Sequence, residues 1–271
     1  MVADLHLHTR CSDGALAPAD LVRLVADRGV RTFSITDHDT MDAYADASPL
    51  ARRLGLTLIP GVEVSTRFGR HDLHLLVYGL DADVPGWASR LLEQKSTRYH
   101  RAKDILSALG AKGVSLTIDD LIAEAGHLNL GRHHIARVLV KAGYASGIQA
   151  AFDRWVLPAS ASIRVRFPDS LDVIAEVRRL GGVSILAHPG ATFPYPDIKA
   201  LVDGGLSGIE SSHPRHDDRV KRKWTDYARR VGILATGGSD YHGHRMGEES
   251  NIGRFQGQHI PEFEVAWQGW T

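Results

Sequence analysis

The sequence predicts an α/β fold in which the strands form a parallel sheet or an α/β barrel. Short apolar runs typical of strands alternate with segments of helical periodicity along most of the chain, as in proteins built from βα units. Residues 87–158 depart from this alternation, because their apolar positions repeat at helical spacing throughout. We therefore expect one strand-and-helix domain, residues 1–86 and 159–271, with an all-helical insertion at residues 87–158 over one end of its core.

Before the insertion, the alternation begins with a strand, and both expected helices end at a glycine. Gly29 and Gly55 directly follow the helical segments and favour a C-cap there. The expected elements are a strand at 2–7, a helix at 20–28, a strand at 31–36, a helix at 42–54, and strands at 56–59 and 73–78.

Inside the insertion, Thr117 and Asp120 have the spacing of an N-cap arrangement in front of a helix. The helices expected there span 87–109, 118–125, 132–142 and 148–156. The alternation then returns with a helix at 171–180, a strand at 183–187, a helix at 197–202, a strand at 206–210, a helix at 218–231 and a strand at 233–236. The C-terminal segment around Trp267 and Trp270 receives no assignment.

The composition indicates a folded globular protein. Of its 271 residues 43% are hydrophobic and the formal net charge is +0, which excludes a disordered chain. No apolar run reaches about 18 residues and no basic-then-apolar leader is present, so neither a membrane span nor secretion is expected. Cys11 is the one cysteine, which excludes a disulfide framework and fits the cytoplasm. The charge balance argues against broad electrostatic capture of nucleic acid.

Histidine is the unusual feature of this composition. The chain has 15 histidines, against 7 phenylalanines and 7 tyrosines. Nearly every expected strand has a metal-type ligand near its end, and the strand at 73–78 has one near its start. These ligands are His6, His8, Asp13, His38, Glu63, His74, His188, Asp240 and His242. In an α/β barrel the carboxyl ends of the strands converge on one face, which is where active sites form. We therefore predict that these residues meet at one site.

The spacing and type of these residues favour divalent metal ions. Residues two apart on a strand share a face, so His6 and His8 can bind one ion together, as can Asp240 and His242. Imidazole and carboxylate ligands suit manganese, iron or zinc, and a carboxylate such as Glu63 can bridge two ions. Three carboxylates contribute about −3 and three divalent ions about +6, which leaves a surplus of about +3. Such a site favours an anion such as a phosphate ester, and a metal-bound water with its pKa lowered to about 7 would be the nucleophile.

Each motif taken alone also has a structural interpretation. A His-x-His pair can belong to an ordinary strand, residues 37–39 can form a turn, and Asp240 can be an N-cap. Chance does not explain why six strand ends carry such residues, so we prefer the metal site. Cys11 has no evident base partner and is not expected to be a nucleophile. Glu210 is either a further ligand or a structural residue at the rim. The remaining histidines considered, which are expected at the surface or in the core, are His71, His127, His216 and His259.

Several motifs together carry a family resemblance. They are His6-Leu7-His8-Thr9, Ser12-Asp13-Gly14, Thr36-Asp37-His38-Asp39-Thr40, Pro60-Gly61-Val62-Glu63, His74, Ala187-His188-Pro189-Gly190 and Gly238-Ser239-Asp240-Tyr241-His242-Gly243. In these motifs the sequence resembles the polymerase and histidinol phosphatase (PHP) family. The resemblance implies a distorted (β/α)7 barrel with a trinuclear metal centre, in which Asp13, His38, Glu63 and His242 are catalytic. The implied ligand sets are His6, His8, Glu63 and Asp240 for one ion, Asp13, His38 and His242 for a second, and Glu63, His74 and His188 for the third.

The insertion resembles a narrower group within that family. Residues 131–140 are similar to a helix of nucleoside 3′,5′-bisphosphate phosphatases, a group that includes the 5′-to-3′ exoribonuclease RNase AM. The resemblance implies that Arg98, Arg101, Arg132 and His134 bind substrate, and that the insertion is a lid over the active-site face. Guanidinium groups and a helix N-terminus both suit phosphate, although solvated helix surface is the alternative for these arginines. After Trp155, where relatives have a Gly/Lys-containing run, this chain reads differently. A basic substrate contact is therefore either missing here or replaced by Arg164 or Arg166.

These observations predict a cytoplasmic metal-dependent phosphoesterase that hydrolyses a phosphate monoester by attack of a metal-bridging hydroxide. The expected substrates are a nucleoside 3′,5′-bisphosphate, a nucleoside monophosphate or a short 5′-phosphorylated oligonucleotide, with short RNA or DNA as a further partner and no membrane. Three divalent ions are expected, manganese first, with iron or zinc as alternatives. The alternative hypotheses are a phosphatase for histidinol phosphate or another small molecule, and a non-catalytic metal-stabilised module.

Overall fold

The computed structural model describes residues 2–161, 163–244 and 246–257. The chain forms two compact units, which we call the strand-bearing unit (Met1–Trp87 with Pro168–Thr271) and the helical unit (Ala88–Phe167). The helical unit is one continuous stretch of chain, whereas the strand-bearing unit is formed by the two stretches that flank it. His259, Trp267 and Trp270 lie outside the described residues.

The strand-bearing unit contains a three-stranded sheet of order β1-β2-β3 and a five-stranded sheet of order β4-β5-β6-β7-β8. The strands are β1 (Ala3–Asp4), β2 (Thr32–Phe33), β3 (Thr57–Leu58), β4 (Gly61–Phe68), β5 (His71–Tyr78), β6 (Val183–Leu186), β7 (Gly208–Ser212) and β8 (Leu234–Gly237). The first sheet is parallel. In the second sheet β5 is antiparallel to both β4 and β6, whereas β6, β7 and β8 are parallel. The unit is therefore an α/β structure with one mixed sheet.

The expectation of a wholly parallel sheet is wrong for β4 and β5, and β4 is absent from the predicted strands. The two strands pair along their full length and are joined by a turn at Gly69 and Arg70. A connection this short permits only an antiparallel pair, because a parallel pair needs a long crossover. Periodicity misses β4 because Glu63, Ser65 and Thr66 are polar although they are buried.

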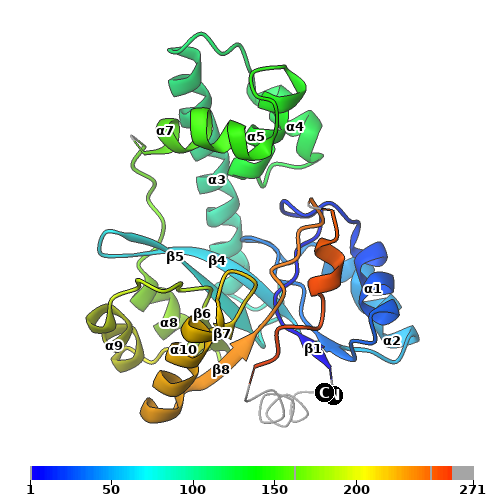
Figure 1. Cartoon of the computed structure of the whole chain (residues 1–271), viewed down its shortest axis with the longest axis vertical. Helices are drawn as coiled ribbons and strands as arrows, with labels where there is room; N and C mark the ends of the chain where they lie inside the picture. The colour runs from blue at the N-terminus through cyan, green and yellow to red at the C-terminus, as the bar shows by residue number, and fades with distance from the viewer. Residues whose placement is uncertain (1, 162, 245, 258–271) are drawn as a thin grey trace. The chain divides into compact units, whose positions relative to one another are not determined.

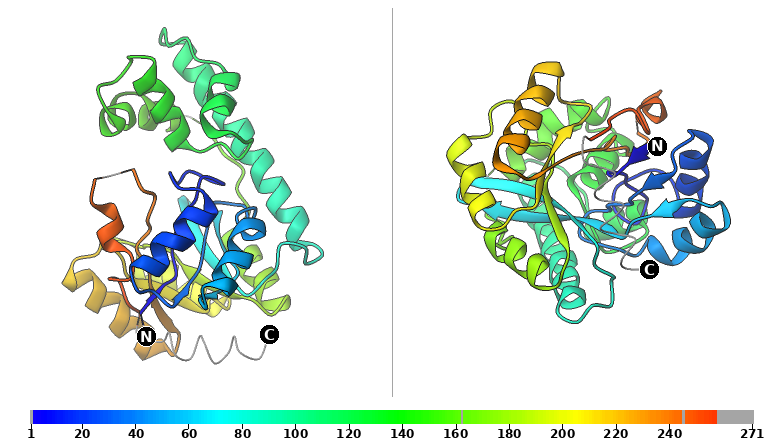
Figure 2. Two further views of the ribbon diagram at one scale, coloured as in Figure 1. Left: turned by 90° about the vertical axis from the view of Figure 1, so that its right-hand side faces the viewer. Right: turned by 90° about the horizontal axis from the view of Figure 1, so that it is seen from below.

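Amphipathic helices flank the two sheets (Figure 1). They are α1 (Pro18–Asp27), α2 (Tyr44–Arg53), α8 (Ser170–Arg179), α9 (Tyr195–Asp203) and α10 (Asp218–Val231). Helix α1 begins at Pro18, which suits the first position of a helix, and it buries Leu21, Val22 and Val25. Figure 2 shows α1 and α2 beside the three-stranded sheet and α8, α9 and α10 beside the five-stranded sheet, with the strands between the two groups.

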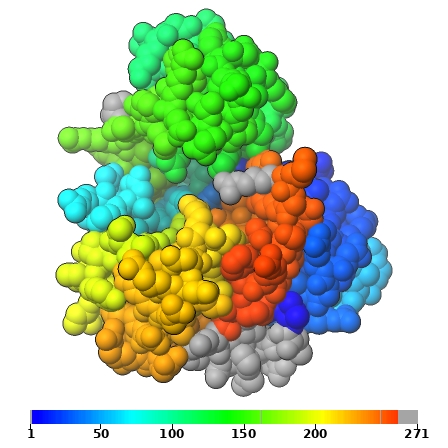
Figure 3. Space-filling view, viewed as in Figure 1, coloured from blue at the N-terminus to red at the C-terminus, as the bar shows by residue number. Residues whose placement is uncertain are grey.

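The segments that follow the strands bring the two sheets together at isolated bridges. Leu7, after β1, is paired with Tyr241, after β8, and His38, after β2, is paired with Glu63 on β4. Of the chain after β8, residues 246–257 lie on the surface between the α10 region and the α1–α2 region, as the orange-red segment in Figure 3 shows. Residues that are distant in the sequence therefore meet at the carboxyl ends of β1, β2 and β8.

Tyr44, at the start of α2, connects three strand ends through its hydroxyl group. The hydroxyl donates toward the carbonyl oxygens of Ile35 (2.8 Å) and Ile59 (2.9 Å) and accepts the N–H of Gly61 (2.6 Å). We expect Tyr44→Phe to lower the free energy of unfolding by about 1–3 kcal/mol, because buried backbone groups would lose their partner. Urea denaturation measures this loss. Tyr195→Phe is the control, since that side chain is exposed, and an equal loss in both variants would contradict the assignment.

The helical unit has its own apolar core. Its helices are α3 (Trp87–Gly110), α4 (Ile118–Ala125), α5 (Arg132–Lys141), α6 (Ile148–Ala151), the π-helical turn η1 (Phe152–Val156) and α7 (Leu157–Ser160). Leu109, Leu121 and Leu139 are among the side chains buried between them. The predicted N-cap is confirmed: Thr117 Oγ1 accepts the N–H of Asp120, and Asp120 Oδ2 accepts the N–H of Thr117. The expected helix at 148–156 is present as α6 continued by η1.

Among the described residues, no helix combines the length and apolar character needed to cross a membrane.

Candidate metal centre

His6 and His8 come from the segment that follows β1. Successive residues of an extended chain point to opposite sides, so Leu5 and Leu7 enter apolar cores while the two histidines share the other side. Both imidazoles are fully buried, and their Nε2 atoms are 3.1 Å apart. The two imidazole nitrogens are close to each other and have the carboxylates of Glu63 and Asp240 beside them. This arrangement indicates a site for a cation that both rings share.

Glu63 lies on β4 at the centre of the cluster, and its two oxygens face different imidazoles. Oε1 is 2.8 Å from His74 Nδ1 and 3.0 Å from His188 Nε2. The contacts of Oε2 are with His6 Nε2 (3.3 Å), His8 Nε2 (3.2 Å) and His38 Nδ1 (3.1 Å). One buried carboxylate therefore connects ligands that follow β1, β2 and β6 with one on β5.

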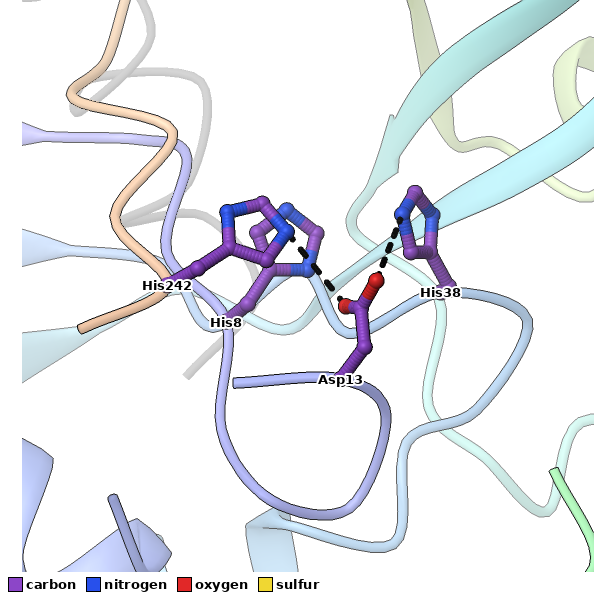
Figure 4. A group of neighbouring side chains, drawn as sticks. All are labelled: His8, Asp13, His38 and His242. Atoms are coloured by element: carbon purple, nitrogen blue, oxygen red, sulfur yellow. Dashed lines mark ion pairs between the residues drawn. The ribbon is translucent and has the colours of Figure 1, made fainter. Parts of the chain in front are cut away.

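Asp240 and Asp13 supply the other two carboxylates. Asp240 Oδ1 lies 3.2 Å from His6 Nε2 and 3.3 Å from His8 Nε2. Asp13 Oδ1 lies 3.3 Å from His242 Nε2, and its Oδ2 lies 3.9 Å from His38 Nε2. Figure 4 shows Asp13 pointing between these two rings, with His8 beside His242.

The donor atoms form three groups, each with its members within 4.8 Å of one another. The groups are His6, His8, Glu63 and Asp240; His8, Asp13, His38 and His242; and His38, Glu63 and His74. His188 joins the third group through its contact with Glu63. The structure thus places every one of the nine predicted ligands in contact with another of them.

Strained backbone accompanies this cluster. Asp39, His188 and Asp240 have φ angles of 52°, 29° and 48°, in the left-handed region that non-glycine residues rarely adopt. Two of them are predicted ligands and the third is next to His38. Strain of this kind persists where surrounding contacts enforce it, and it is concentrated at functional sites.

The residues of the motif at 37–39 have different roles. Asp37 accepts hydrogen bonds from the N–H of Thr9 (2.7 Å) and the hydroxyl of Ser12 (2.6 Å). Asp39 accepts from the N–H and the hydroxyl of Ser65, at 2.7 and 2.8 Å. The two aspartates therefore fix neighbouring loops, and His38 between them faces the cluster.

Two buried residues that were not predicted from the sequence, Asp4 and His213, hold the cluster in place. Asp4 accepts the N–H of Ser239 (2.9 Å) with Oδ1 and that of Gly253 (2.9 Å) with Oδ2, and burial raises its pKa to about 6. His213 contacts Asp240 Oδ2 through Nε2 at 3.1 Å. His213 follows the expected strand at 206–210, so the pattern that found the ligands also applied to it. Asp4 is the last residue of β1, but it belongs to none of the motifs on which the prediction rested.

Glu210, left open between ligand and structural residue, orients two predicted ligands. Its Oε1 is 2.9 Å from His6 Nδ1, and its Oε2 accepts the backbone N–H of His188 at 2.8 Å. A carboxylate on the far nitrogen of a ligating histidine fixes the ring and raises its basicity. The far nitrogen of His6 thus faces Glu210, while Nε2 faces the cluster.

Replacing this carboxylate tests its role. We expect Glu210→Gln to lower the affinity for divalent metal by about 10–100-fold, because the amide can accept only one of the two hydrogen bonds. Isothermal titration of the metal-free protein with Mn²⁺ measures this affinity. Glu93→Gln, at an exposed position of α3, is the matched control. Equal affinities in the two variants would show that Glu210 is not needed to orient His6.

Opposite charges dominate the electrostatics of the cluster. Burial alone would raise the pKa of Glu63, but positive charge on His38, His74 and His6 holds that pKa well below its usual value. Burial would likewise lower the pKa of His242, but the negative charges of Asp13 and Asp240 raise it to about 10. In the metal-free protein, protons on the imidazoles therefore balance the negative charge of the carboxylates.

The residues present fit divalent cations. The donor set is imidazole and carboxylate, which suits manganese, iron and zinc, and no thiolate takes part among the described residues. In addition, the Nε2 atoms of His6 and His8 both lie within 3.3 Å of Glu63 Oε2 and of Asp240 Oδ1. A divalent cation held by these atoms would balance the two buried carboxylates.

The predicted substrate contacts lie in the helical unit and are not all gathered together. Arg101 lines a cavity of about 290 Å³ with Arg164 and Arg166, and its guanidinium lies 5.4 Å from the centre of the Phe167 ring. Arg98 is nearly buried on the same helix and does not line that cavity.

The other two predicted contacts are at the start of α5. Arg132 is the first residue of this helix and is partly exposed. His134 is buried, and its Nδ1 accepts the N–H of Gly131 at 2.9 Å, which caps the helix. His134 thus has a structural contact that the sequence did not indicate.

The remaining residues considered from the sequence lie outside the cluster. Burial raises the pKa of the Cys11 thiol to about 11, which opposes a role as nucleophile. His71 pairs with Asp197 at 3.2 Å in a partly exposed position, and His127 contacts the His134 ring. His216 is buried beside the cluster, where its ring bonds to backbone.

Comparison with known proteins gives the following relatives. The sequence model of the PHP domain family matches residues 4–130 of this chain. A 3′,5′-nucleoside bisphosphate phosphatase of Chromobacterium violaceum is 30% identical over 88% of this chain and 86% of its own length. A phosphoribosyl 1,2-cyclic phosphate 1,2-diphosphodiesterase of Eggerthella lenta is 30% identical over 93% of this chain and 98% of its own length. The 5′-3′ exoribonuclease Rnm of Escherichia coli is 30% identical over 89% of this chain and 85% of its own length.

One solved structure has a similar fold. The structure of an amidohydrolase from Chromobacterium violaceum, with bound sulfate and no metal, has a TM-score of 0.87 and 28% identity, and the match covers 98% of this chain and 97% of that one.

Proposed function

The chain belongs to the PHP family, and from this membership and the geometry of the cluster we propose that it is a metal-dependent phosphoesterase that hydrolyses a phosphate monoester of a nucleotide. The observation that carries the proposal is the convergence of six imidazoles and three carboxylates in one cluster, with Glu63 at its centre. The proposed substrates are a nucleoside 3′,5′-bisphosphate, a nucleoside monophosphate or a short 5′-phosphorylated oligonucleotide. The names of the Chromobacterium and Escherichia relatives support this class of substrate.

We propose three divalent ions, with manganese first and iron or zinc as alternatives. The three groups of donor atoms support this number, and Glu63 belongs to two of them. When bound, such ions polarise phosphoryl oxygens and lower the pKa of a water molecule to about 7, which makes it a nucleophile. The distorted (β/α)7 barrel also remains part of the proposal, and the bridges Leu7↔Tyr241 and His38↔Glu63 support it.

The protein's own side chains bind the reacting group from one side of the cluster. His74, His188 and His242 are 26%, 18% and 17% exposed, whereas His6 and His8 are not exposed at all. A phosphate therefore reaches the cluster from the side of the partly exposed rings. Asp13, His38, His242 and Glu63 are the residues we propose to be catalytic. Asp13 contacts the partly exposed rings of His242 and His38, and Glu63 contacts His38.

We propose further that the helical unit serves as a substrate lid that binds the part of the substrate remote from the reacting phosphate. Arg98, Arg101 and Arg132 have the chemistry for bidentate phosphate contacts, and Arg132 also lies at a helix N-terminus. His134 would act through its Nε2, because its Nδ1 caps α5.

The test is phosphate release by the purified protein loaded with Mn²⁺. We expect kcat/KM to be highest for a nucleoside 3′,5′-bisphosphate or a short 5′-phosphorylated oligonucleotide, and lower for histidinol phosphate and for substrates without a second phosphate. A phosphoribosyl cyclic phosphate belongs in the same panel, because the name of the Eggerthella relative favours that substrate as the second candidate. No release from any member would refute the proposal.

A further inference from the structure

The loop after β7, residues 213–217, is fixed to the candidate metal centre at two points. His213 Nδ1 accepts the backbone N–H of Arg215 at 3.0 Å, so Nε2 carries the proton that it donates to Asp240 Oδ2 at 3.1 Å. His216 Nε2 accepts the N–H of Gly190 at 3.0 Å, and its Nδ1 donates to the carbonyl of Ser211. The loop is thereby attached to the segments that carry Asp240 and His188.

Arg215 is the exposed residue of this hydrogen-bonded loop. Its side chain is 68% exposed, and its Nη2 lies 3.1 Å from Asp240 Oδ2. The other oxygen of Asp240 faces the interior of the cluster, toward His6 and His8. The guanidinium is always charged and cannot bind a metal ion, so Arg215 places a permanent positive charge at the outer edge of the cluster.

We infer that Arg215 is a substrate-binding residue that holds the phosphate at the mouth of the metal centre. The inference rests on the proposed function. A cation bound at Asp240 Oδ1 would share the charge of this carboxylate and weaken its attraction for Arg215, while His213 would still hold Oδ2. The exposed guanidinium then turns to the oxygens of a phosphate, which its planar fork of N–H groups matches in pairs.

A purely structural role explains Arg215 less well. An exposed ion pair of arginine with carboxylate contributes little to stability. Asp240 is already held by His213 on one oxygen and by His6 and His8 on the other. Arg215 is thus not required to place Asp240. Its exposed positive charge beside the cluster favours the binding of an anion there.

The experiment measures binding of inorganic phosphate to the Mn²⁺-loaded protein by titration calorimetry. We expect Arg215→Gln to weaken this binding by at least about tenfold, and Arg215→Lys to weaken it less, because lysine keeps the charge and loses the fork. Arg219→Gln, at an exposed position in the first turn of α10, is the matched control and leaves phosphate affinity unchanged. With substrate, Arg215→Gln raises KM by the same factor and changes kcat little, because the contact is made before and during the reaction.

Metal content separates binding from positioning. All variants should hold the same equivalents of manganese after gel filtration, and a loss in Arg215→Gln would overturn the inference by assigning the residue to Asp240. Equal phosphate affinity in Arg215→Gln and the unmutated protein would overturn it as well. If the unmutated protein binds phosphate but hydrolyses no ester, the proposed function is refuted and the role of Arg215 in phosphate binding is still supported. If the unmutated protein binds no phosphate, both the proposed function and the role of Arg215 are refuted.

Discussion

Glu63→Gln is expected to lower kcat for phosphate release by about 10³-fold, the largest effect of any single substitution in this chain. Both oxygens of Glu63 face imidazole nitrogens, His74 and His188 from one oxygen and three further rings from the other. Glutamine keeps the shape of the side chain but removes the charge and replaces one acceptor by an NH₂ group. Two groups of donor atoms would lose a ligand in one step, so at least one metal equivalent should be lost together with activity.

The measurement combines steady-state phosphate release with metal analysis of the same preparation. Glu93→Gln on α3 is the control for the chemical change itself, since Glu93 is exposed and outside the cluster. Circular dichroism shows whether Glu63→Gln is folded, because a buried carboxylate surrounded by imidazoles is also part of the charge balance. A folded Glu63→Gln protein with normal kcat would show that the cluster is not the site of hydrolysis.

The sequence predicted the residues of the candidate site more completely than it predicted the topology of the sheets. A functional ligand must be histidine, aspartate or glutamate, so residues such as His6, Glu63 and Asp240 remain visible in a single sequence. The signal was their recurrence after strands, which works because strand ends meet. The direction in which two strands pair leaves no such chemical mark on the sequence, and the buried polar residues Ser65 and Thr66 hide the strand character of β4.

Residues that act through other residues were predicted least well. Asp4, Glu210 and His213 each hold a ligand or its loop, and their roles depend on which atoms they reach in space. Glu210 ends the expected strand at 206–210 and His213 directly follows β7, so the strand-end pattern applied to both. The pattern does not distinguish a metal ligand from a residue that supports one. That distinction needs the orientation of the His6 ring, with Nδ1 to Glu210 and Nε2 to the cluster.

Removal of the metal ions is expected to abolish activity and lower the melting temperature while the fold is kept. Ions that bind only the folded state stabilise it by about 4 kcal/mol at a thousand times their dissociation constant, which corresponds to about 10 °C for a chain of this size. Treatment with EDTA followed by differential scanning calorimetry measures the shift, and added Mn²⁺ should restore both properties. A protein that shows the shift but never releases phosphate would instead be the non-catalytic metal-stabilised module.

The pKa values in the cluster determine how the stability of the metal-free protein depends on pH. In the metal-free protein, the raised pKa of His242, about 10 against 6.5 in the unfolded chain, gives stability that is complete below pH 6.5 and is lost as the pH rises toward 10. The lowered pKa of Glu63 gives stability that is present above its unfolded value of 4.5 and is lost as the pH falls through its folded value. The metal-free protein should therefore be most stable between pH 4.5 and 6.5.

Metal binding has the opposite dependence, because cations bind the neutral imidazoles and displace their protons. Affinity for Mn²⁺ should rise with pH over the same range in which the metal-free protein loses stability. The difference in melting temperature between loaded and metal-free protein should accordingly widen from pH 6.5 to 9. Calorimetry at several pH values, in buffers without affinity for manganese, measures this difference. A difference that narrows over that range would mean that the histidines around Glu63 are not the groups that bind the metal.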